Sequence, residues 1–224
     1  MRPKHLAIEL SKLQQHPQHS VELEQYSTEG DLAAFFVLAI DQLDLLEGKT
    51  VIDVGAGNGV LGLGCAMIGA SNVVLIEADH EVLSVAKTNA DKITNKYNCS
   101  IETVQCMIGQ EQPPQFSDVD IIVMNPPWGF QNSRADRPLL EYGFSLQPRS
   151  MYVLHSQKAS HLKGIAKAHG YDWEIVFESN FRLPPKYSHQ SRKMGETQVK
   201  CWRFHLPGDA KIIDEDGISL DKFV

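Results

Sequence analysis

The chain has 224 residues, of which 42% are hydrophobic and 22% charged, a composition typical of a globular domain and not of a disordered or fibrous protein. Its 21 Lys and Arg residues against 28 Asp and Glu residues give a net charge of −7, which excludes polyanion binding through overall charge. No apolar run reaches the roughly 18 residues of a membrane-spanning helix, and the start lacks a signal sequence. We therefore expect a cytoplasmic protein without a membrane partner. The four cysteines lack metal-ligand spacing, so we expect reduced thiols and no metal site.

Two helices are predicted at the start of the chain. The first covers residues 3–15, and the second covers residues 31–46 and has a broad apolar face. Ser27 or Thr28 is a suitable cap for the second helix. We predict that residues 1–46 form a helical extension and that its segment around Tyr26 is a lid over a cofactor.

A glycine-rich loop follows the first predicted strand, residues 51–54, and precedes a helix over residues 60–68. In this order, backbone N–H groups and the helix N-terminus can face a ligand without obstruction by Cβ atoms. The glycines Gly55, Gly57 and Gly59 are spaced Gly-x-Gly-x-Gly. Dinucleotide-binding enzymes carry Gly-x-Gly-x-x-Gly, so this spacing argues against a nicotinamide dehydrogenase.

Strands continue to alternate with helices after this loop. Residues 73–76 form the second strand, and Glu77 at its end is placed to accept hydrogen bonds from ribose hydroxyls. Asp79 caps a helix over residues 80–93, and strands follow at 101–104 and 119–124. This alternation predicts an α/β fold with a doubly wound, mostly parallel sheet, which brings Gly55, Glu77 and Asn125 to one edge.

The strand ending at residue 124 opens into Asn125, Pro126, Pro127 and Trp128. The prolines fix two φ angles and remove two donors, which leaves acceptor groups beside an aromatic ring. Such a site suits a planar substrate with an exocyclic amine: the Asn125 side-chain oxygen and a backbone carbonyl accept its hydrogens while Trp128 stacks on the ring. Pro-Pro also occurs in inert turns, so the motif alone leaves a plain loop open.

Beyond this motif we predict a helix at 138–146, a strand at 150–154, a helix at 155–169 and a strand at 173–178. A final strand at 197–206, antiparallel to its neighbour, completes a seven-stranded domain over residues 47–206, and an acidic tail follows at 207–224. We assign no catalytic part to His155 or His189. Trp173 and Trp202 are interpreted as packing residues.

A basic segment interrupts this acidic chain. Residues 182–203 contain six Lys and Arg residues against one Glu, a local charge of +5. A solvated hairpin is one interpretation, but interleaved aromatic residues favour contact with a phosphate backbone. The residues predicted to contact RNA are Arg182, Lys186, Tyr187, His189, Arg192 and Lys193.

The motifs together resemble those of a known family. The loop from Asp53 to Gly59 resembles motif I of class I S-adenosylmethionine-dependent methyltransferases, and Asn-Pro-Pro-Trp resembles the catalytic motif of those that methylate amino nitrogens. With Tyr152 to His155 and Leu183-Pro184, these motifs resemble the eukaryotic and archaeal family that makes N6-methyladenosine in small-subunit ribosomal RNA. The resemblance covers residues 6–204 in order.

The resemblance implies S-adenosylmethionine as cofactor, RNA as substrate and a Rossmann-like fold. It implies that Asn125, Pro126, Pro127 and Trp128 hold the target adenine, and that the cofactor is bound by Tyr26, Thr28, Asp53, Gly55, Gly57, Gly59, Glu77 and Ala78. The resemblance to the eukaryotic relatives also implies a small zinc-containing activator protein as a partner, and nothing in the sequence decides whether this chain needs it. The family commonly has an acid after Gln-Cys for the cofactor's adenine amine, whereas this chain has Met107, so another group must replace it.

Three other functions remain open at this point. A protein-glutamine methyltransferase would use the same motif on a side-chain amide. A DNA adenine methyltransferase is a second alternative, although no target-recognition domain is visible. A noncatalytic binding module on a methyltransferase fold is the third, and Met107 is the feature that favours it.

Overall fold

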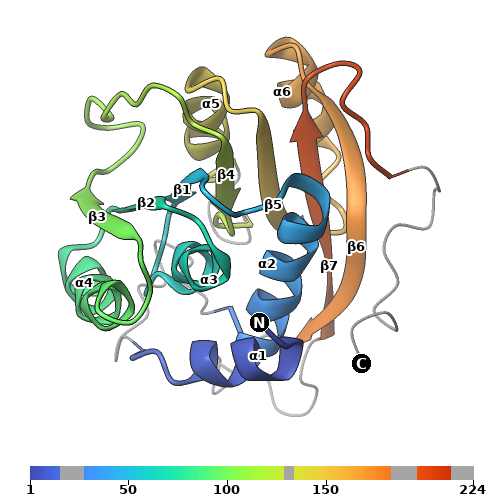
Figure 1. The fold of residues 1–224 in the computed structure, drawn as a ribbon. Helices are drawn as coiled ribbons and strands as arrows, with labels where there is room; N and C mark the ends of the chain where they lie inside the picture. The colour runs from blue at the N-terminus through green and yellow to red at the C-terminus, as the bar shows by residue number, and fades with distance from the viewer. Residues whose placement is uncertain (16–27, 129–133, 183–195, 213–224) are drawn as a thin grey trace, which may run out of the picture.

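A computed structural model describes residues 1–15, 28–128, 134–182 and 196–212 (Figure 1). Six helices and seven strands lie in these ranges. The helices are α1 (Pro3–Ser11), α2 (Gly30–Asp44), α3 (Val60–Ile68), α4 (His80–Thr94), α5 (Arg137–Ser145) and α6 (His161–Ala168). The strands are β1 (Thr50–Val54), β2 (Asn72–Glu77), β3 (Ser100–Gln105), β4 (Ile121–Met124), β5 (Ser150–Ser156), β6 (Asp172–Arg182) and β7 (Glu196–His205).

All seven strands form one sheet with the order β3-β2-β1-β4-β5-β7-β6. The first five are parallel to one another, and β7 pairs antiparallel with both β5 and β6. This confirms the predicted doubly wound, mostly parallel sheet with an antiparallel last strand. Because β2, β1 and β4 are adjacent, the segments after their carboxyl ends are neighbours at one edge of the sheet.

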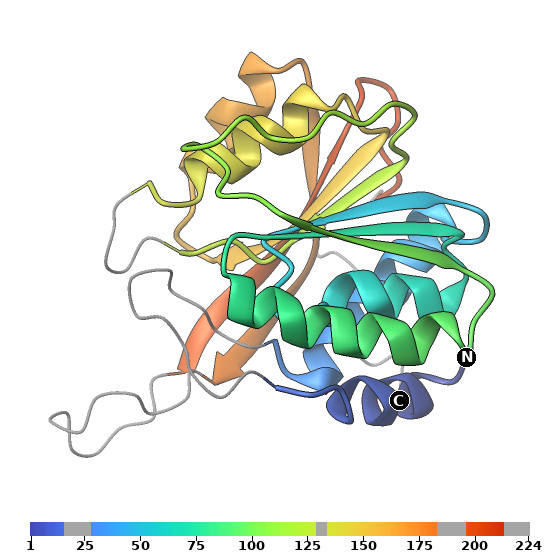
Figure 2. The same ribbon diagram turned by 90° about the vertical axis from the view of Figure 1, so that its left-hand side faces the viewer.

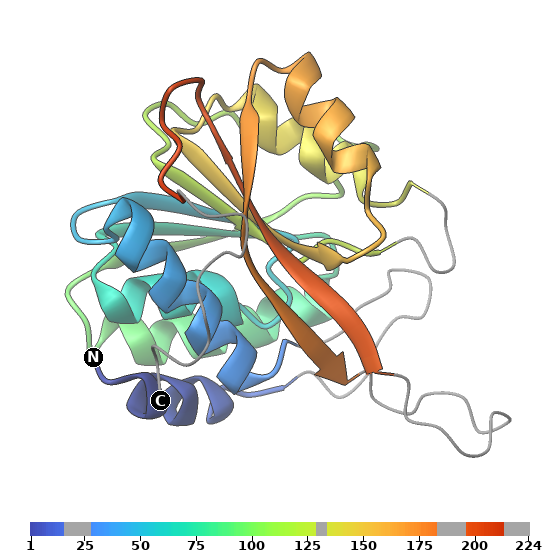
Figure 3. The ribbon, with the colours of Figure 1, turned by 90° about the vertical axis from the view of Figure 1, so that its right-hand side faces the viewer.

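Helices cover both faces of the sheet. Figures 2 and 3 show α1 to α4 on one face and α5 and α6 on the other. Two apolar cores correspond to these layers: one joins the first four helices to the sheet, and the other lies under α5 and α6. The central strands β1 and β4 are buried on both sides, which explains their continuous apolar runs. Among the described helices, none is long and apolar enough to cross a membrane.

Several predicted boundaries were wrong. The first helix ends at Ser11, not at residue 15. Glu29, not Thr28, is the N-cap of α2, and no side chain caps this end. Residue 155 does not begin a helix, because β5 continues through Ser156, where it pairs with Val199 of β7, and α6 begins only at His161.

The local charge of +5 predicted for residues 182–203 is partly neutralised within the protein, beginning with Arg203 of β7. Its side chain is 0% exposed and forms ion pairs with Asp44 (2.9 Å), Glu174 (3.0 Å) and Asp209 (2.9 Å). Lys200 is also paired, with Glu178 at 2.6 Å. Two of the six cations counted in this segment are therefore matched by carboxylates of the protein.

Candidate active site

The glycine loop after β1 has the backbone that its sequence predicts. Gly55, Gly57 and Gly59 have φ angles of 72°, 58° and 86°, in the left-handed region that residues with a Cβ rarely adopt. The amides of Gly55 and Ala56 both donate to the Ile76 carbonyl at 2.9 Å, which ties the loop to β2. A Cβ on Gly57 would have no heavy atom of the described chain within 4 Å. The loop therefore presents an unobstructed backbone at Gly57.

Glu77 joins this loop to the end of β2. Its Oε2 accepts from the Gly57 amide at 2.8 Å, and its Oε1 accepts from the amides of Ala78 (2.9 Å) and Asp79 (3.0 Å). A carboxylate has about four acceptor positions. Within the described part of the chain, these bonds use three of them and leave one on Oε2. Glu77 is thus fixed in place with room for one further donor.

Asp53 supports the loop from inside the core. Its side chain is 1% exposed and accepts a 2.8 Å hydrogen bond from the Gly62 amide in the first turn of α3. Burial raises the pKa of Asp53 to about 7, with a further contribution from the negative charge of Glu77, against the lowering effect of the Gly62 hydrogen bond. Its predicted contact with a cofactor stays a prediction.

Asn125 and Trp128 form a hydrogen-bonded unit after β4. The indole Nε1–H of Trp128 donates to Asn125 Oδ1 at 3.1 Å, and Asn125 Nδ2 donates to the Thr28 hydroxyl at 3.0 Å. An indole N–H is only a donor, so the amide atom that faces it must be the oxygen. The two contacts therefore fix which way the Asn125 amide points. Pro126 is buried, while Asn125, Pro127 and Trp128 are partly exposed.

The segment after α1 also reaches the site. Gln14 shares reciprocal hydrogen bonds with the buried side chain of Asn89, and its carbonyl accepts from Asn58 in the glycine loop. Thr28 contacts Asn125. Residues 14 and 28, on either side of residues 16–27, are therefore both bonded to the site. The predicted lid itself, including Tyr26, lies outside the described residues.

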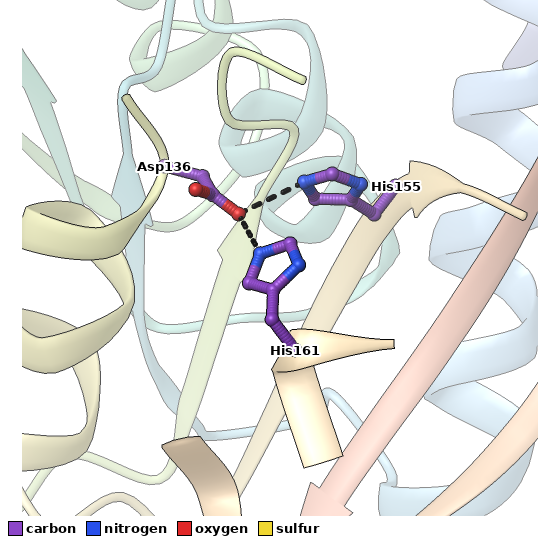
Figure 4. A group of neighbouring side chains, drawn as sticks. All are labelled: Asp136, His155 and His161. Carbon is purple, nitrogen blue, oxygen red and sulfur yellow. Dashed lines mark hydrogen bonds and ion pairs between the residues drawn. The ribbon is translucent and has the colours of Figure 1, made fainter. Parts of the chain in front are cut away.

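Three residues that the sequence analysis did not select lie beside this unit. Asp136, His155 and His161 have ligand atoms within 4.8 Å of one another (Figure 4). His155 is a buried residue near the carboxyl end of β5, at the same sheet edge as Asn125. A polar residue at the carboxyl end of a parallel strand is a candidate site residue, so His155 could be predicted on the same ground as Asn125.

The segment after β3 contains a fourth residue that the motifs did not indicate. Glu111 Oε2 accepts a 2.8 Å hydrogen bond from the backbone amide of Met107. A turn closes this segment, because the Glu111 amide donates back to the Met107 carbonyl at 3.0 Å. A carboxylate is therefore hydrogen-bonded to the backbone of Met107, although the Met107 side chain itself is not acidic. Glu111 lies four residues beyond Met107, so the Gln-Cys motif does not point to it.

Of the six residues predicted to contact RNA, only Arg182 lies in the described part of the chain. Arg182 is the last residue of β6 and lies opposite Glu196 of β7. The other five lie outside the described residues: Lys186, Tyr187, His189, Arg192 and Lys193.

Comparisons with known proteins agree with this architecture. An uncharacterized protein, MJ0284 of Methanocaldococcus jannaschii, is 29% identical over 93% of this chain and 96% of its own length. The rRNA N(6)-adenosine-methyltransferase METTL5 of Danio rerio is 27% identical over 91% of this chain and 99% of its own. The crystal structure of PH1948 from Pyrococcus horikoshii, described as a candidate RNA methyltransferase, has 30% identity and a TM-score of 0.77 over 92% of this chain and 98% of its own.

These matches confirm the resemblance that the motifs indicated, and they extend over nearly the whole chain. A family model described as Conserved hypothetical protein 95 matches residues 32–179. The match begins in α2, includes the glycine loop and the Asn-Pro-Pro-Trp motif, and ends within β6. Because it spans more than half of the 224 residues, the chain belongs to the Conserved hypothetical protein 95 family.

Proposed function

We propose that this protein transfers a methyl group from S-adenosylmethionine to the exocyclic N6 amine of an adenosine in RNA. The observation that carries the proposal is the orientation of Asn125, whose amide oxygen is fixed by the Trp128 indole N–H at the edge of the sheet next to the glycine loop. An amide oxygen has two acceptor positions. Trp128 takes one, and the second accepts a hydrogen of the target amine.

The residues at the ends of β1 and β2 fit S-adenosylmethionine. The open space over Gly57 admits the methionine part, and the remaining acceptor position on Glu77 Oε2 accepts from a ribose hydroxyl. Ala78 and Thr28 border this region. Glu111, in the segment after β3, supplies the acid that Met107 does not, and it accepts from the amine of the cofactor's adenine.

The role of the protein in the reaction is alignment. S-adenosylmethionine supplies a methyl group on a positively charged sulfur that leaves as a neutral thioether. The lone pair of an adenine amine is delocalised into the ring. Hydrogen bonds from its two N–H groups to the Asn125 side-chain oxygen and the Pro126 carbonyl favour a more tetrahedral nitrogen. This nitrogen attacks the methyl carbon in line with the bond that breaks. The methylated nitrogen carries a positive charge and loses its proton to water. No dedicated base is required.

The target base must leave its stack to reach Asn125. Stacking on Trp128 contributes on the order of 1–3 kcal/mol to its binding. Small-subunit ribosomal RNA is the proposed substrate, supported by the rRNA N(6)-adenosine-methyltransferase named among the relatives. We place the activity in the cytoplasm, and we include a small zinc-containing activator among its partners on the strength of the family resemblance alone.

The test is transfer of labelled methyl from S-adenosylmethionine to small-subunit rRNA, to DNA of the same sequence and to a protein extract, each with and without a zinc-containing activator. We expect label in rRNA with wild type and a loss of roughly 100-fold or more with Asn125→Ala. Calorimetry should show cofactor binding by both proteins. Label in protein only would indicate a glutamine methyltransferase, and absence of cofactor binding would indicate a noncatalytic module.

A further inference from the structure

The function proposed above assigns no role to the cluster of Asp136, His155 and His161. Asp136 precedes α5, His155 lies near the end of β5, and His161 begins α6, so three elements bring these side chains together (Figure 4). Asp136 Oδ2 lies 3.0 Å from His155 Nε2 and 2.5 Å from His161 Nε2. Asp136 and His155 are buried, whereas the His161 side chain is 46% exposed.

The hydrogen bonds of His155 argue against a metal site in this cluster. The Ser156 amide donates to His155 Nδ1 at 2.8 Å, so Nδ1 carries no proton and the neutral ring carries its proton on Nε2. That Nε2–H points at Asp136 Oδ2. A metal-bound histidine has the opposite arrangement, since it uses one nitrogen as ligand and donates from the other.

The fixed His155 ring in turn lies against Trp128. The two ring centroids are 6.2 Å apart and the planes are within 26° of parallel, which is within the range of aromatic pairs. Trp128 donates to Asn125 Oδ1. A continuous series of contacts therefore runs from Asp136 through His155 and Trp128 to Asn125.

We propose that Asp136 and His155 are positioning residues for the target-base site, which hold the Trp128 ring so that its N–H fixes the Asn125 amide oxygen toward the substrate amine. His161 is the second donor to Asp136 and keeps this buried carboxylate paired on its exposed side. The inference rests on the proposed function for its catalytic consequence. Its structural part, the coupling of Asp136 to Trp128, is independent of that function.

Nuclear magnetic resonance of the indole N–H groups tests the coupling without any activity. The chain has three tryptophans, so a protein labelled with ¹⁵N-tryptophan has three indole signals, and Trp128→Phe identifies the one from Trp128. Asp136→Asn, a substitution of similar shape, should shift or broaden the Trp128 signal and leave those of Trp173 and Trp202 unchanged. The control Arg137→Gln alters the next residue, whose ion pair with Glu141 is exposed, and should move none of them. An unchanged Trp128 signal in Asp136→Asn would overturn the proposal.

Kinetics test the consequence for catalysis. Asp136→Asn and His155→Phe should lower kcat for RNA by roughly 10- to 100-fold, the range expected when a catalytic group is misplaced by about 1 Å. The Kd for S-adenosylmethionine should stay within about twofold, since the cofactor contacts proposed at Gly57 and Glu77 lie at the ends of β1 and β2, whereas this series of contacts ends at Asn125 after β4. A rise in the Kd for S-adenosylmethionine as large as the fall in kcat, together with a lower melting temperature, would instead show a merely structural role and overturn the proposal.

A double-mutant cycle separates positioning from independent effects. In a Trp128→Phe background, which keeps an aromatic ring but lacks the indole N–H, Asp136→Asn should cost much less than it does in wild type. Additive losses would overturn the proposed route through Trp128.

Metal analysis completes the test: one zinc ion retained per wild-type chain and lost from His161→Ala would show a metal site instead. A wild-type protein that transfers no methyl group, with the Trp128 signal coupled to Asp136, would defeat the proposed function and leave the positioning intact.

Discussion

Thr28 and Asn125 are 97 residues apart in sequence and are joined by a 3.0 Å hydrogen bond from Asn125 Nδ2 to the Thr28 hydroxyl oxygen. This contact links the segment before α2 to the segment after β4. Thr28 is buried, so the amide hydrogen has little access to water as a replacement partner. The helical extension therefore helps to orient the residue proposed to accept the target amine.

The first prediction concerns this bond. Thr28→Val removes the hydroxyl oxygen that accepts this bond. One amide hydrogen of Asn125 then lacks its partner, which costs about 1–3 kcal/mol. We expect kcat for RNA to fall roughly 5- to 100-fold, because each 1.4 kcal/mol is a factor of ten. Thr28→Ser keeps the hydroxyl and should stay near wild type. Equal activities of the two variants in a methyl-transfer assay would contradict the role of this bond.

Gly57→Ala should weaken cofactor binding. The new Cβ would meet no atom of the described chain, but it would occupy the space over the loop, and the φ of 58° costs about 1–2 kcal/mol with a Cβ present. Gly208→Ala is a matched control, because Gly208 has a φ of 86° and similarly open surroundings away from the loop. Both variants should lose similar stability in urea unfolding. Only Gly57→Ala should raise the Kd for S-adenosylmethionine, and an equal Kd in both would count against the glycine loop as the binding site.

Glu111→Gln tests the replacement for the acid at Met107. A glutamine side chain keeps one acceptor oxygen for the Met107 amide but loses the negative charge that strengthens a hydrogen bond from the adenine amine. We expect the Kd for S-adenosylmethionine to rise roughly 5- to 20-fold, the equivalent of about 1–2 kcal/mol. Glu102→Gln, in the middle of β3, is the control. If calorimetry gave the same Kd for both variants, Glu111 would have no part in the adenine pocket.

Asp53 should make stability depend on pH. Its pKa is raised from 3.8 to about 7 by burial, so the folded state binds a proton more tightly than the unfolded state does. The resulting stabilisation is complete below about pH 4, is lost as the pH rises toward 7, and changes no further above that. The slope within this window is at most about 1.4 kcal/mol per pH unit.

Asp53→Asn removes this titration and keeps an oxygen for the Gly62 amide. The free energy of unfolding of the variant relative to wild type should therefore increase from pH 4 to pH 7 and then level off. Denaturant unfolding at a series of pH values measures this difference directly. A difference that is constant with pH would mean that Asp53 is ionised throughout.

Arg203 should contribute strongly to stability. Asp44 accepts from Arg203, Lys211 and Tyr152, and these bonds outweigh the effect of burial and hold the pKa of Asp44 well below its ordinary value. Arg203→Leu would leave the carboxylates of Asp44 and Glu174 without this partner, at a cost of about 3–5 kcal/mol. Arg137→Leu breaks an exposed pair and should cost less than about 1 kcal/mol. Similar losses in urea unfolding would contradict this interpretation.

The sheet edge could be predicted because each clue was local. Gly55, Glu77 and Asn125 each follow a short apolar strand, and parallel strands bring their carboxyl ends to one edge. The contacts within that edge could not be predicted, because they join distant residues. Nothing in the sequence near Thr28 indicates a hydrogen bond with Asn125, and a helix cap was the more obvious role.

Charge and periodicity gave wrong predictions for Arg203 and His155. Arg203 was counted with a basic surface because the sequence shows its charge and not its burial or the carboxylates of Asp44 and Glu174. His155 was assigned to a helix because residues 155–169 fit a helical pattern, whereas pairing with Lys200 of β7 keeps it in β5. The Asp136 and His155 pair was not predicted because the two residues are 19 positions apart, one before α5 and the other in β5.

The central claim is that Asn125 selects an exocyclic amine, and the identity of the methylated nucleoside tests it most directly. After reaction with small-subunit rRNA, the RNA is digested to nucleosides and analysed by mass spectrometry against standards for each methyladenosine. The orientation of Asn125 Oδ1 by Trp128 predicts N6-methyladenosine as the product and its loss in Asn125→Ala. Methylation at a ring nitrogen or carbon of adenine, or on another base, would contradict the account.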